Sequence, residues 1–192
     1  MLAETFAAAL IAVIILSAVP VSAGAADFHA RDKAHPIDVS PVDTGRIEVV
    51  HPDGGRTTLE AALGEGAAIV HFWATWCVPC RAELPELARF RARLTEGGLA
   101  EEGLADRLLV ISLDRSSYER VAAFVSNDLG LSEFKTLQNT DGRAGPAFGL
   151  FGLPATALLD GQRRIVALAQ GPVDWNDQTL ADRLRRHLAG GE

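Results

Sequence analysis

The sequence is poor in cysteine: only two of its 192 residues are Cys, and both lie in one tetrapeptide, Cys77-Val78-Pro79-Cys80. A disulfide between them closes a very short loop and constrains the unfolded chain little, so we do not expect it to serve stability. The chain also lacks an excess of basic residues, because 25 Asp and Glu outnumber 18 Lys and Arg. A net charge of −7 without a basic stripe argues against a nucleic-acid partner.

Charge is absent between Thr5 and Ala26, a stretch that is apolar from Phe6 to Val19 and ends in small residues. An apolar run followed by small residues is typical of a secretory signal peptide, although no Lys or Arg precedes it here. The uncharged stretch is about 22 residues long, enough for an uncleaved membrane anchor. We therefore expect residues 1–26 to be a signal peptide or an anchor. The protein is then periplasmic, either tethered to the inner membrane or soluble after cleavage.

The rest of the chain divides into a linker and one domain. Residues 27–43 show no periodicity and contain His-Pro and Ser-Pro steps, which are typical of a linker. Residues 44–190 alternate short apolar runs with helical patterns. This order predicts one α/β domain, in which a mixed central sheet has helices on both faces and an N-terminal strand extension.

Two buried strands, 67–73 and 108–113, follow from short apolar runs, and a helix is expected over 78–95 with a kink at Pro85. The remaining expected elements are strands at 47–50 and 56–59, a helix at 60–63, a helix opened by a capping box at Ser116 and Glu119, a strand at 134–137, a helix at 144–150, strands at 155–159 and 165–169 joined by a turn at Asp160-Gly161, and a last helix capped by Asp174 or Asn176.

Cys77 lies where the first buried strand gives way to a helix. The first turn of a helix has unpaired N–H groups and the positive end of the helix dipole, which stabilise an anion. A thiolate there has a lowered pKa, and the thiolate is the nucleophile. Cys80 lies one turn further on the same side. The pair predicts that Cys77 attacks a partner's disulfide and that Cys80 then resolves the mixed disulfide.

Two cysteines are also half of a metal site. A structural zinc ion needs two more Cys or His ligands, and the five scattered histidines form no suitable pair. Copper(I) suits soft thiolates, so a Cu(I)-handling chaperone is the alternative function. A peroxide-reducing cysteine requires Thr or Ser three residues upstream, where this chain has Ala74. We expect no cofactor.

The segment 72–85 (FWATWCVPCRAELP) resembles the active-site segment of the thioredoxin superfamily, and in particular its TlpA/ResA/CcmG branch. Segments 152–156 (GLPAT) and 171–175 (GPVDW) resemble the cis-proline segment and the segment after the last strand of TlpA-like proteins. The resemblance spans residues 45–190 and implies a thioredoxin fold. It also implies a membrane-tethered or periplasmic thiol reductant in cytochrome c maturation or cytochrome oxidase assembly. A disulfide oxidase or isomerase on the same fold is the other possibility.

The resemblance assigns a proton-accepting role to Glu83, which matches the glutamate that helps to deprotonate the resolving Cys80. From the residues alone, an exposed helix glutamate paired with Arg81 is the alternative. His71 departs from the pattern, because cytoplasmic thioredoxins have a buried acid at this position. We expect a core histidine hydrogen-bonded to the backbone, with tuning of Cys80 as the alternative.

The substrate-binding residues follow from the same resemblance. Pro154 matches the cis proline that faces the first cysteine, and Leu153 before it offers its backbone to an extended partner strand. Trp76, Val78 and Pro79 surround the reactive sulfur. The implied partners are a disulfide-containing protein substrate and a membrane thiol-electron donor, and we expect the protein to be a monomer.

Overall fold

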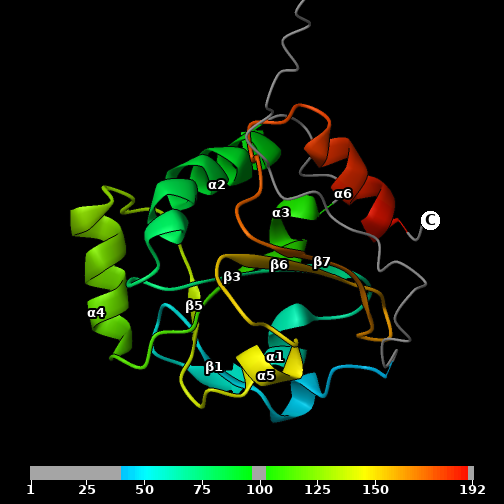
Figure 1. Cartoon of the computed structure of the whole chain (residues 1–192), viewed down its shortest axis with the longest axis horizontal. Coiled ribbons are helices and arrows are strands. Elements are labelled where there is room, and N and C mark those ends of the chain that lie inside the picture. Colours follow the sequence, from blue (N-terminus) through cyan, green and yellow to red (C-terminus); the bar gives the residue numbers. More distant parts are fainter. Residues whose placement is uncertain (1–39, 97–102, 190–192) are drawn as a thin grey trace, which may run out of the picture.

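The computed structural model describes residues 40–96 and 103–189. Its centre is a seven-stranded mixed sheet with the order β2-β1-β5-β4-β3-β6-β7 (Figure 1). The predicted signal peptide or anchor (1–26) and most of the predicted linker (27–43) lie outside the described residues. The strands are β1 (Glu48–Val50), β2 (Arg56–Thr58), β3 (Ala68–Trp73), β4 (Leu108–Ser112), β5 (Leu137–Asn139), β6 (Ala155–Leu159) and β7 (Ile165–Gln170).

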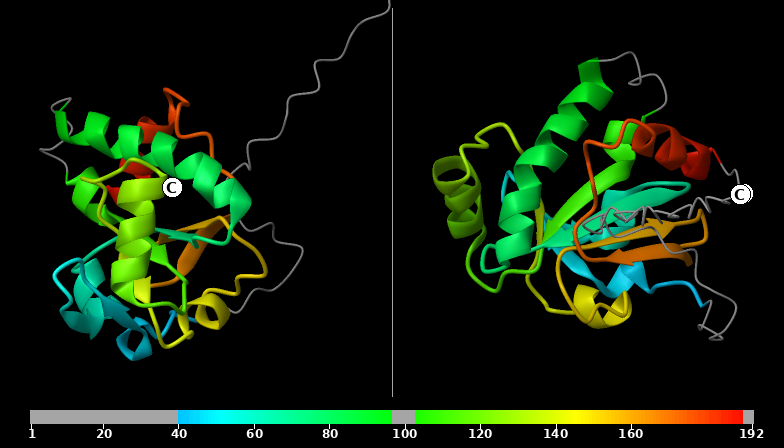
Figure 2. Two further views of the ribbon diagram at one scale, coloured as in Figure 1. Left: turned by 90° about the vertical axis from the view of Figure 1, so that its left-hand side faces the viewer. Right: turned by 45° about the horizontal axis from the view of Figure 1, so that its top comes forward.

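Helices cover both faces of this sheet, as Figures 1 and 2 show. None of the helices in the described part of the chain is long and apolar enough to cross a bilayer. They are α1 (Leu59–Leu63), α2 (Val78–Glu96), α3 (Leu104–Arg107), α4 (Tyr118–Ala123), α5 (Ala144–Ala147) and α6 (Leu180–Leu188), with a 3-10 turn η1 (Thr44–Arg46) and a π-helical segment η3 (Phe124–Asp128) after α4.

The strand β3 lies in the interior of the sheet, between β4 and β6, and all six of its residues are buried. It pairs in parallel with β4 and antiparallel with β6. A strand with neighbours on both edges and helices on both faces has no exposed side, which explains its almost uninterrupted apolar run. The antiparallel hairpin β1–β2 joins the sheet through β5. The predicted thioredoxin-like mixed sheet with its N-terminal strand extension is therefore confirmed.

Strand alternation sorts the side chains of β3 between two cores. Ile69 and Trp73 pack with the buried face of α2 and with α6, whereas Val70 and Phe72 pack with α1 and α5. His71 alternates with the first pair and so faces α2. The buried residues of α2 lie along one face of the helix and include Cys80, Glu83, Leu84, Leu87, Phe90 and Leu94. The helix continues through Pro85.

Helix starts and short strands differ from the predictions. The N-cap of α4 is Ser117 instead of Ser116, and it makes no side-chain capping bond, so the predicted capping box is wrong. The helix α6 begins at Leu180 after Thr179, because Asp177 accepts hydrogen bonds from Thr179 within a preceding turn. Strand β5 starts three residues later than predicted, and α5 ends three residues earlier.

The β6–β7 connection is longer than the predicted two-residue turn. Arg163 has φ 62°, the only described residue other than glycine with a positive φ. Its side chain is 8% exposed and donates to both carboxylate oxygens of Glu60 and to the carbonyls of Gly64 and Gly66. These contacts hold the left-handed conformation and tie the hairpin to the loop before β3.

Candidate active site

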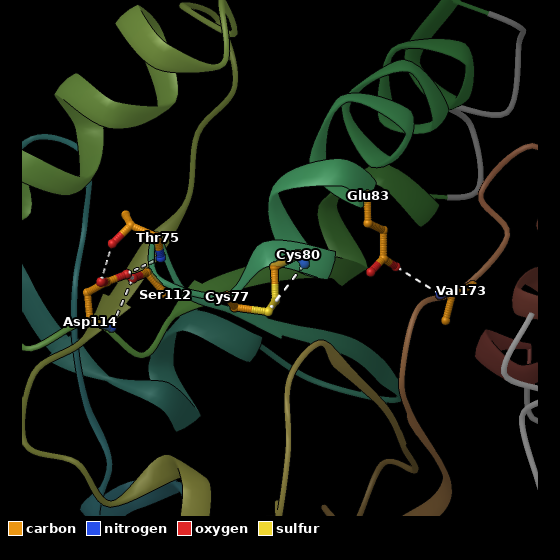
Figure 3. Close-up of a disulfide and its surroundings, with 7 residues drawn as sticks. All are labelled: Thr75, Cys77, Cys80, Glu83, Ser112, Asp114 and Val173. Atoms are coloured by element: carbon orange, nitrogen blue, oxygen red, sulfur yellow. Dashed lines mark hydrogen bonds between the residues drawn. A yellow bond between two sulfur atoms is a disulfide. The ribbon is translucent and has the colours of Figure 1, made fainter.

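The disulfide Cys77–Cys80 lies at the start of α2, just beyond the carboxyl end of β3 (Figure 3). The chain leaves β3 at Trp73, and α2 begins at Val78, so Cys77 occupies the N-cap position. The two Cα atoms are 5.3 Å apart. The two cysteines therefore meet where the sequence predicted, at the mouth of a helix that follows a buried strand.

The sulfur of Cys77 takes the place of an N-cap oxygen. The backbone N–H of Cys80, the third residue of the helix, donates to Cys77 Sγ at 3.2 Å. Pro79 in between has no N–H, so the Cys80 amide is the donor that the first turn offers to this sulfur. The same donor and the helix dipole stabilise a thiolate on Cys77 once the disulfide is reduced.

The two cysteines differ in accessibility. Cys77 is 5% exposed and Cys80 is fully buried. Exposed side chains rim the disulfide: Trp76 is 67% exposed, Val78 is 71% exposed, and Pro79 also faces solvent. Cys77 is therefore the more accessible of the two cysteines, and Cys80 is buried behind it.

A buried carboxylate, which the sequence did not suggest, anchors the loop before Cys77. Asp114 accepts hydrogen bonds from the Thr75 amide at 2.9 Å, the Thr75 hydroxyl at 2.6 Å and the Ser112 hydroxyl at 2.7 Å (Figure 3). Ser112 ends β4, the parallel neighbour of β3. The sequence feature that could have revealed this anchor is Asp114 directly after the predicted buried strand 108–113. The carboxyl ends of neighbouring parallel strands lie at the same edge of the sheet, so Asp114 is brought close to the end of β3.

Glu83 is buried, at 4% exposure, so the exposed ion pair with Arg81 is not what the structure shows. Its Oε1 accepts the Val173 amide at 3.0 Å and the indole N–H of Trp175. Its Oε2 has no hydrogen-bond partner among the described residues. In Figure 3 the carboxylate lies between the disulfide and Val173.

Burial raises the pKa of Glu83 to about 7, while the hydrogen bonds from Val173 and Trp175 act in the opposite direction. The negative charge of Glu86 on the same helix adds to the rise. A carboxyl group with such a pKa exchanges its proton near neutral pH, which is the property of a general acid–base group.

His71 is fully buried, and its pKa is lowered to about 3 because burial disfavours the imidazolium. Its Nδ1 lies 3.0 Å from the hydroxyl of Thr156 on β6, so the expected bond to the backbone is wrong: the partner is a side chain. Its ring meets the indole of Trp175 edge to face, with ring centroids 5.6 Å apart.

The peptide bond between Leu153 and Pro154 is cis, as the sequence predicted. Ala155 pairs with Phe72, so the register places Pro154 beside the end of β3 from which the Cys77 loop departs. Leu153 is half-buried and packs against both cores.

A hollow of about 570 Å³ adjoins Trp76 and is lined in part by Asp114, Arg115 and Asn139.

No group of three or more His, Cys, Asp or Glu side chains within residues 40–96 and 103–189 is arranged to hold a metal ion.

Comparison with known proteins places these features in a family. The profile of the Redoxin family matches residues 31–184. The thiol:disulfide interchange protein DsbE of Pseudomonas aeruginosa is 32% identical over 129 residues, which cover 66% of this chain and 64% of the relative. The thiol-disulfide oxidoreductase ResA of Oceanobacillus iheyensis is 25% identical over 144 residues, which cover 74% of this chain and 67% of the relative.

The chain thus spans less than two thirds of the length of the DsbE relative. Among solved structures, StoA of Bacillus subtilis superposes with a TM-score of 0.53 at 20% identity, covering 77% of this chain and 98% of that one. At this identity the superposition concerns the fold.

Proposed function

This chain belongs to the Redoxin family, and from that we propose that it is a thiol–disulfide oxidoreductase that reduces disulfides of partner proteins by dithiol exchange. The observation that carries the proposal is the Cys77–Cys80 disulfide at the N-terminus of α2, with the accessible sulfur capping the helix and the second sulfur buried behind it. DsbE and ResA, two of its relatives, are by name interchange proteins and oxidoreductases.

The cycle begins with the reduced pair. The Cys77 thiolate attacks one sulfur of the partner's disulfide, a new S–S bond forms, and the partner's other sulfur leaves as a thiolate that takes a proton from water. Cys80 then loses its proton and attacks Cys77 Sγ. The bond between Cys77 and the partner breaks, so the partner leaves with both sulfurs reduced, and Cys77 and Cys80, which have given up two electrons, remain joined as a disulfide.

Glu83 takes the proton of Cys80 in the second step. It lies three residues after Cys80, which places it one helical turn away. Its Oε1 is occupied by two donors and its Oε2 is unpartnered among the described residues, so one oxygen is held and the other is available. With a pKa of about 7, Glu83 is partly ionised at neutral pH and can accept the proton.

Trp76, Val78 and Pro79 form the apolar rim on which the partner docks. The exposed apolar side chains of Trp76 and Val78 flank Cys77 in the sequence, where a partner disulfide has to approach. Leu153, before the cis Pro154, supplies backbone for an extended partner segment next to the sulfur. The partner is therefore a protein whose disulfide lies in an extended, accessible stretch.

The apolar N-terminal segment and the resemblance to the TlpA/ResA/CcmG branch support an extracytoplasmic location. They also support a part in cytochrome c maturation or cytochrome oxidase assembly, with a membrane thiol-electron donor that re-reduces Cys77–Cys80. Under this proposal electrons flow from that donor to the partner protein.

The purified protein, a thiol reductant and a protein with an exposed CxxC disulfide test the proposal. Turnover is expected, and Cys77→Ser abolishes it; a Cys77→Ser variant as active as its parent refutes the mechanism. The potential of the couple, measured against glutathione, tests the direction. A value close to thioredoxin's, about −270 mV, indicates a reductant, and a value close to DsbA's, about −120 mV, indicates an oxidant.

A further inference from the structure

A continuous set of contacts links β6 to the carboxylate of Glu83. Thr156 on β6 hydrogen-bonds Nδ1 of His71 on β3 at 3.0 Å. The imidazole meets the indole of Trp175 edge to face, with the two planes at 83°. Trp175 then donates its indole N–H to Glu83 Oε1. Each contact fixes the next ring or group, so the orientation of His71 bears on the orientation of the carboxylate.

Packing alone does not explain a histidine at position 71. The residue is fully buried, and its Nε2 has no hydrogen-bond partner among the described residues. An unpaired polar atom in a core costs free energy that an apolar side chain would not. The strand neighbours of His71 are the apolar Val70 and Phe72. A polar ring at this position therefore calls for a reason beyond filling space.

We propose that His71 is a positioning residue for exchange: anchored by Thr156, its ring holds the Trp175 indole on Oε1 of Glu83 and so keeps Oε2 free to receive the Cys80 proton. The inference rests on the role of Glu83 in the proposed function. Phe90 of α2 also contacts Trp175, with ring centroids 5.3 Å apart, so the indole is held from the helix as well as from the sheet.

Loosening the indole has a defined chemical consequence. The N–H of Trp175 stabilises the ionised carboxylate, so its loss raises the pKa of Glu83 further. Less carboxylate is then present at a given pH. The pH at which the Cys80 step reaches half its maximal rate moves upward. The Cys77 step does not use Glu83 and keeps its rate.

Other charged and titratable groups also bear on this carboxylate. Glu86 lies on the same helix and raises the pKa of Glu83. Arg93, further along α2, donates to the carbonyl of Trp175 at 2.9 Å. Asp174 adjoins Trp175 in the chain, and the thiols of Cys77 and Cys80 complete the set when the protein is reduced. All of them are unchanged in the His71, Thr156 and Val125 variants below, so they contribute equally to the profiles of the second step.

Reaction of the reduced full chain with 5,5′-dithiobis(2-nitrobenzoate) separates the two steps. Attack by Cys77 releases one nitrothiobenzoate, and attack by Cys80 on the resulting mixed disulfide releases the second. A Cys80→Ser background isolates the first step. We measure both rates from pH 5 to pH 9 for the parent, His71→Ala, His71→Phe, Thr156→Val and, as a packing control elsewhere in the same core, Val125→Ala.

His71→Ala is expected to raise the midpoint of the second step by about half to one pH unit, which is about a three- to tenfold slower step at pH 6. His71→Phe keeps a ring against the indole but loses the Thr156 anchor, so its midpoint is expected between those of the parent and His71→Ala. Thr156→Val removes the hydrogen bond to the ring but keeps the ring, so it is expected to raise the midpoint by less than His71→Ala does. If His71→Ala does not fold, Thr156→Val alone tests the inference. Val125→Ala leaves the midpoint in place.

An unshifted midpoint in both His71→Ala and Thr156→Val overturns the inference. Glu83→Gln separates this outcome from failure of the proposed function. Where Glu83→Gln removes the pH dependence of the second step and the His71 and Thr156 variants do not shift it, only the positioning role is wrong. Where Glu83→Gln also leaves the second step unchanged, Glu83 is not the proton acceptor and both proposals fall.

Discussion

The amide of Val173 donates a hydrogen bond of 3.0 Å to Oε1 of Glu83 and thereby joins the loop after β7 to the second turn of α2. Trp175 binds the same oxygen. The carboxylate is consequently fixed inside the protein within one helical turn of Cys80, and within residues 40–96 and 103–189 only its Oε1 has hydrogen-bond partners. Its burial, and not an ion pair, governs its ionisation.

Glu83 makes the stability of the oxidised protein depend on pH. Its pKa is raised from 4.5 to about 7, so the folded state favours the protonated form. Its stabilising contribution is complete below pH 4.5 and is lost as the pH rises through 7, by about 3 kcal/mol in total. We therefore expect the free energy of unfolding of Glu83→Gln, relative to the parent, to increase by about 2.5 kcal/mol between pH 5 and pH 8. Urea unfolding at the two pH values measures it, and an unchanged difference contradicts the raised pKa.

His71 acts in the opposite sense. Burial lowers its pKa from 6.5 to about 3, so the folded state favours the neutral ring. The stability that this ring contributes is complete above pH 6.5 and is lost as the pH falls toward 3, by about 1.4 kcal/mol per unit. Phenylalanine does not titrate. The free energy of unfolding of His71→Phe, relative to the parent, should therefore increase by about 2–3 kcal/mol when the pH is lowered from 7 to 4.5. Denaturant titrations at these pH values provide the measurement, and a parallel acid loss in parent and variant would speak against a buried neutral imidazole.

Asp114 is the anchor of the loop that carries Cys77. Asp114→Ala leaves the Thr75 amide and two hydroxyl groups without their acceptor. We expect a loss of about 2–3 kcal/mol in the free energy of unfolding, because hydrogen bonds to a buried charge are the stronger kind. The exposed Asp174 provides a matched control, and Asp174→Ala should change stability by less than about 0.5 kcal/mol. Equal effects of the two variants would show that the Asp114 network anchors nothing.

Trp76 should matter for the partner and little for the fold. Its side chain is 67% exposed beside Cys77. Trp76→Ala is expected to raise the KM for a disulfide protein by about fivefold or more, and to leave both the rate with 5,5′-dithiobis(2-nitrobenzoate) and the unfolding midpoint close to the parent's. Val166, 41% exposed on the edge strand β7, serves as control. A KM that changes no more in Trp76→Ala than in Val166→Ala would remove Trp76 from the docking surface.

The sequence was sufficient for the features that are local. The apolar run of β3 and the position of Cys77 before a helical pattern both lie within one stretch of chain, and both are observed. The cis bond before Pro154 is also observed, and it was implied by the resemblance of segment 152–156 to the cis-proline segment of a known family. Hydrophobic periodicity acts over a few residues, so it can be recognised without a structure.

Features that depend on residues far apart in the sequence could not be predicted from it. Glu83 and Trp175 are 92 residues apart, and nothing around either one reveals that they bind. The conformation of Arg163 depends on Glu60 in α1, which lies far from it in the sequence. His71 was expected to bind backbone, and its partner turned out to be a side chain on a neighbouring strand. The observed N-caps are Ser117 and Thr179 instead of the predicted residues, because several polar residues in a row compete for each cap position.

The most direct test of dithiol exchange through these two cysteines is to identify the sulfur that first bonds to the partner. Cys80→Ser is mixed with a protein that bears an exposed CxxC disulfide, the adduct is isolated without reductant, and its linked peptides are sequenced by mass spectrometry. A stable mixed disulfide on Cys77 is expected, together with a far slower reaction of Cys77→Ser through the buried Cys80. An adduct that forms as fast on Cys80 in Cys77→Ser as on Cys77 in Cys80→Ser would contradict it.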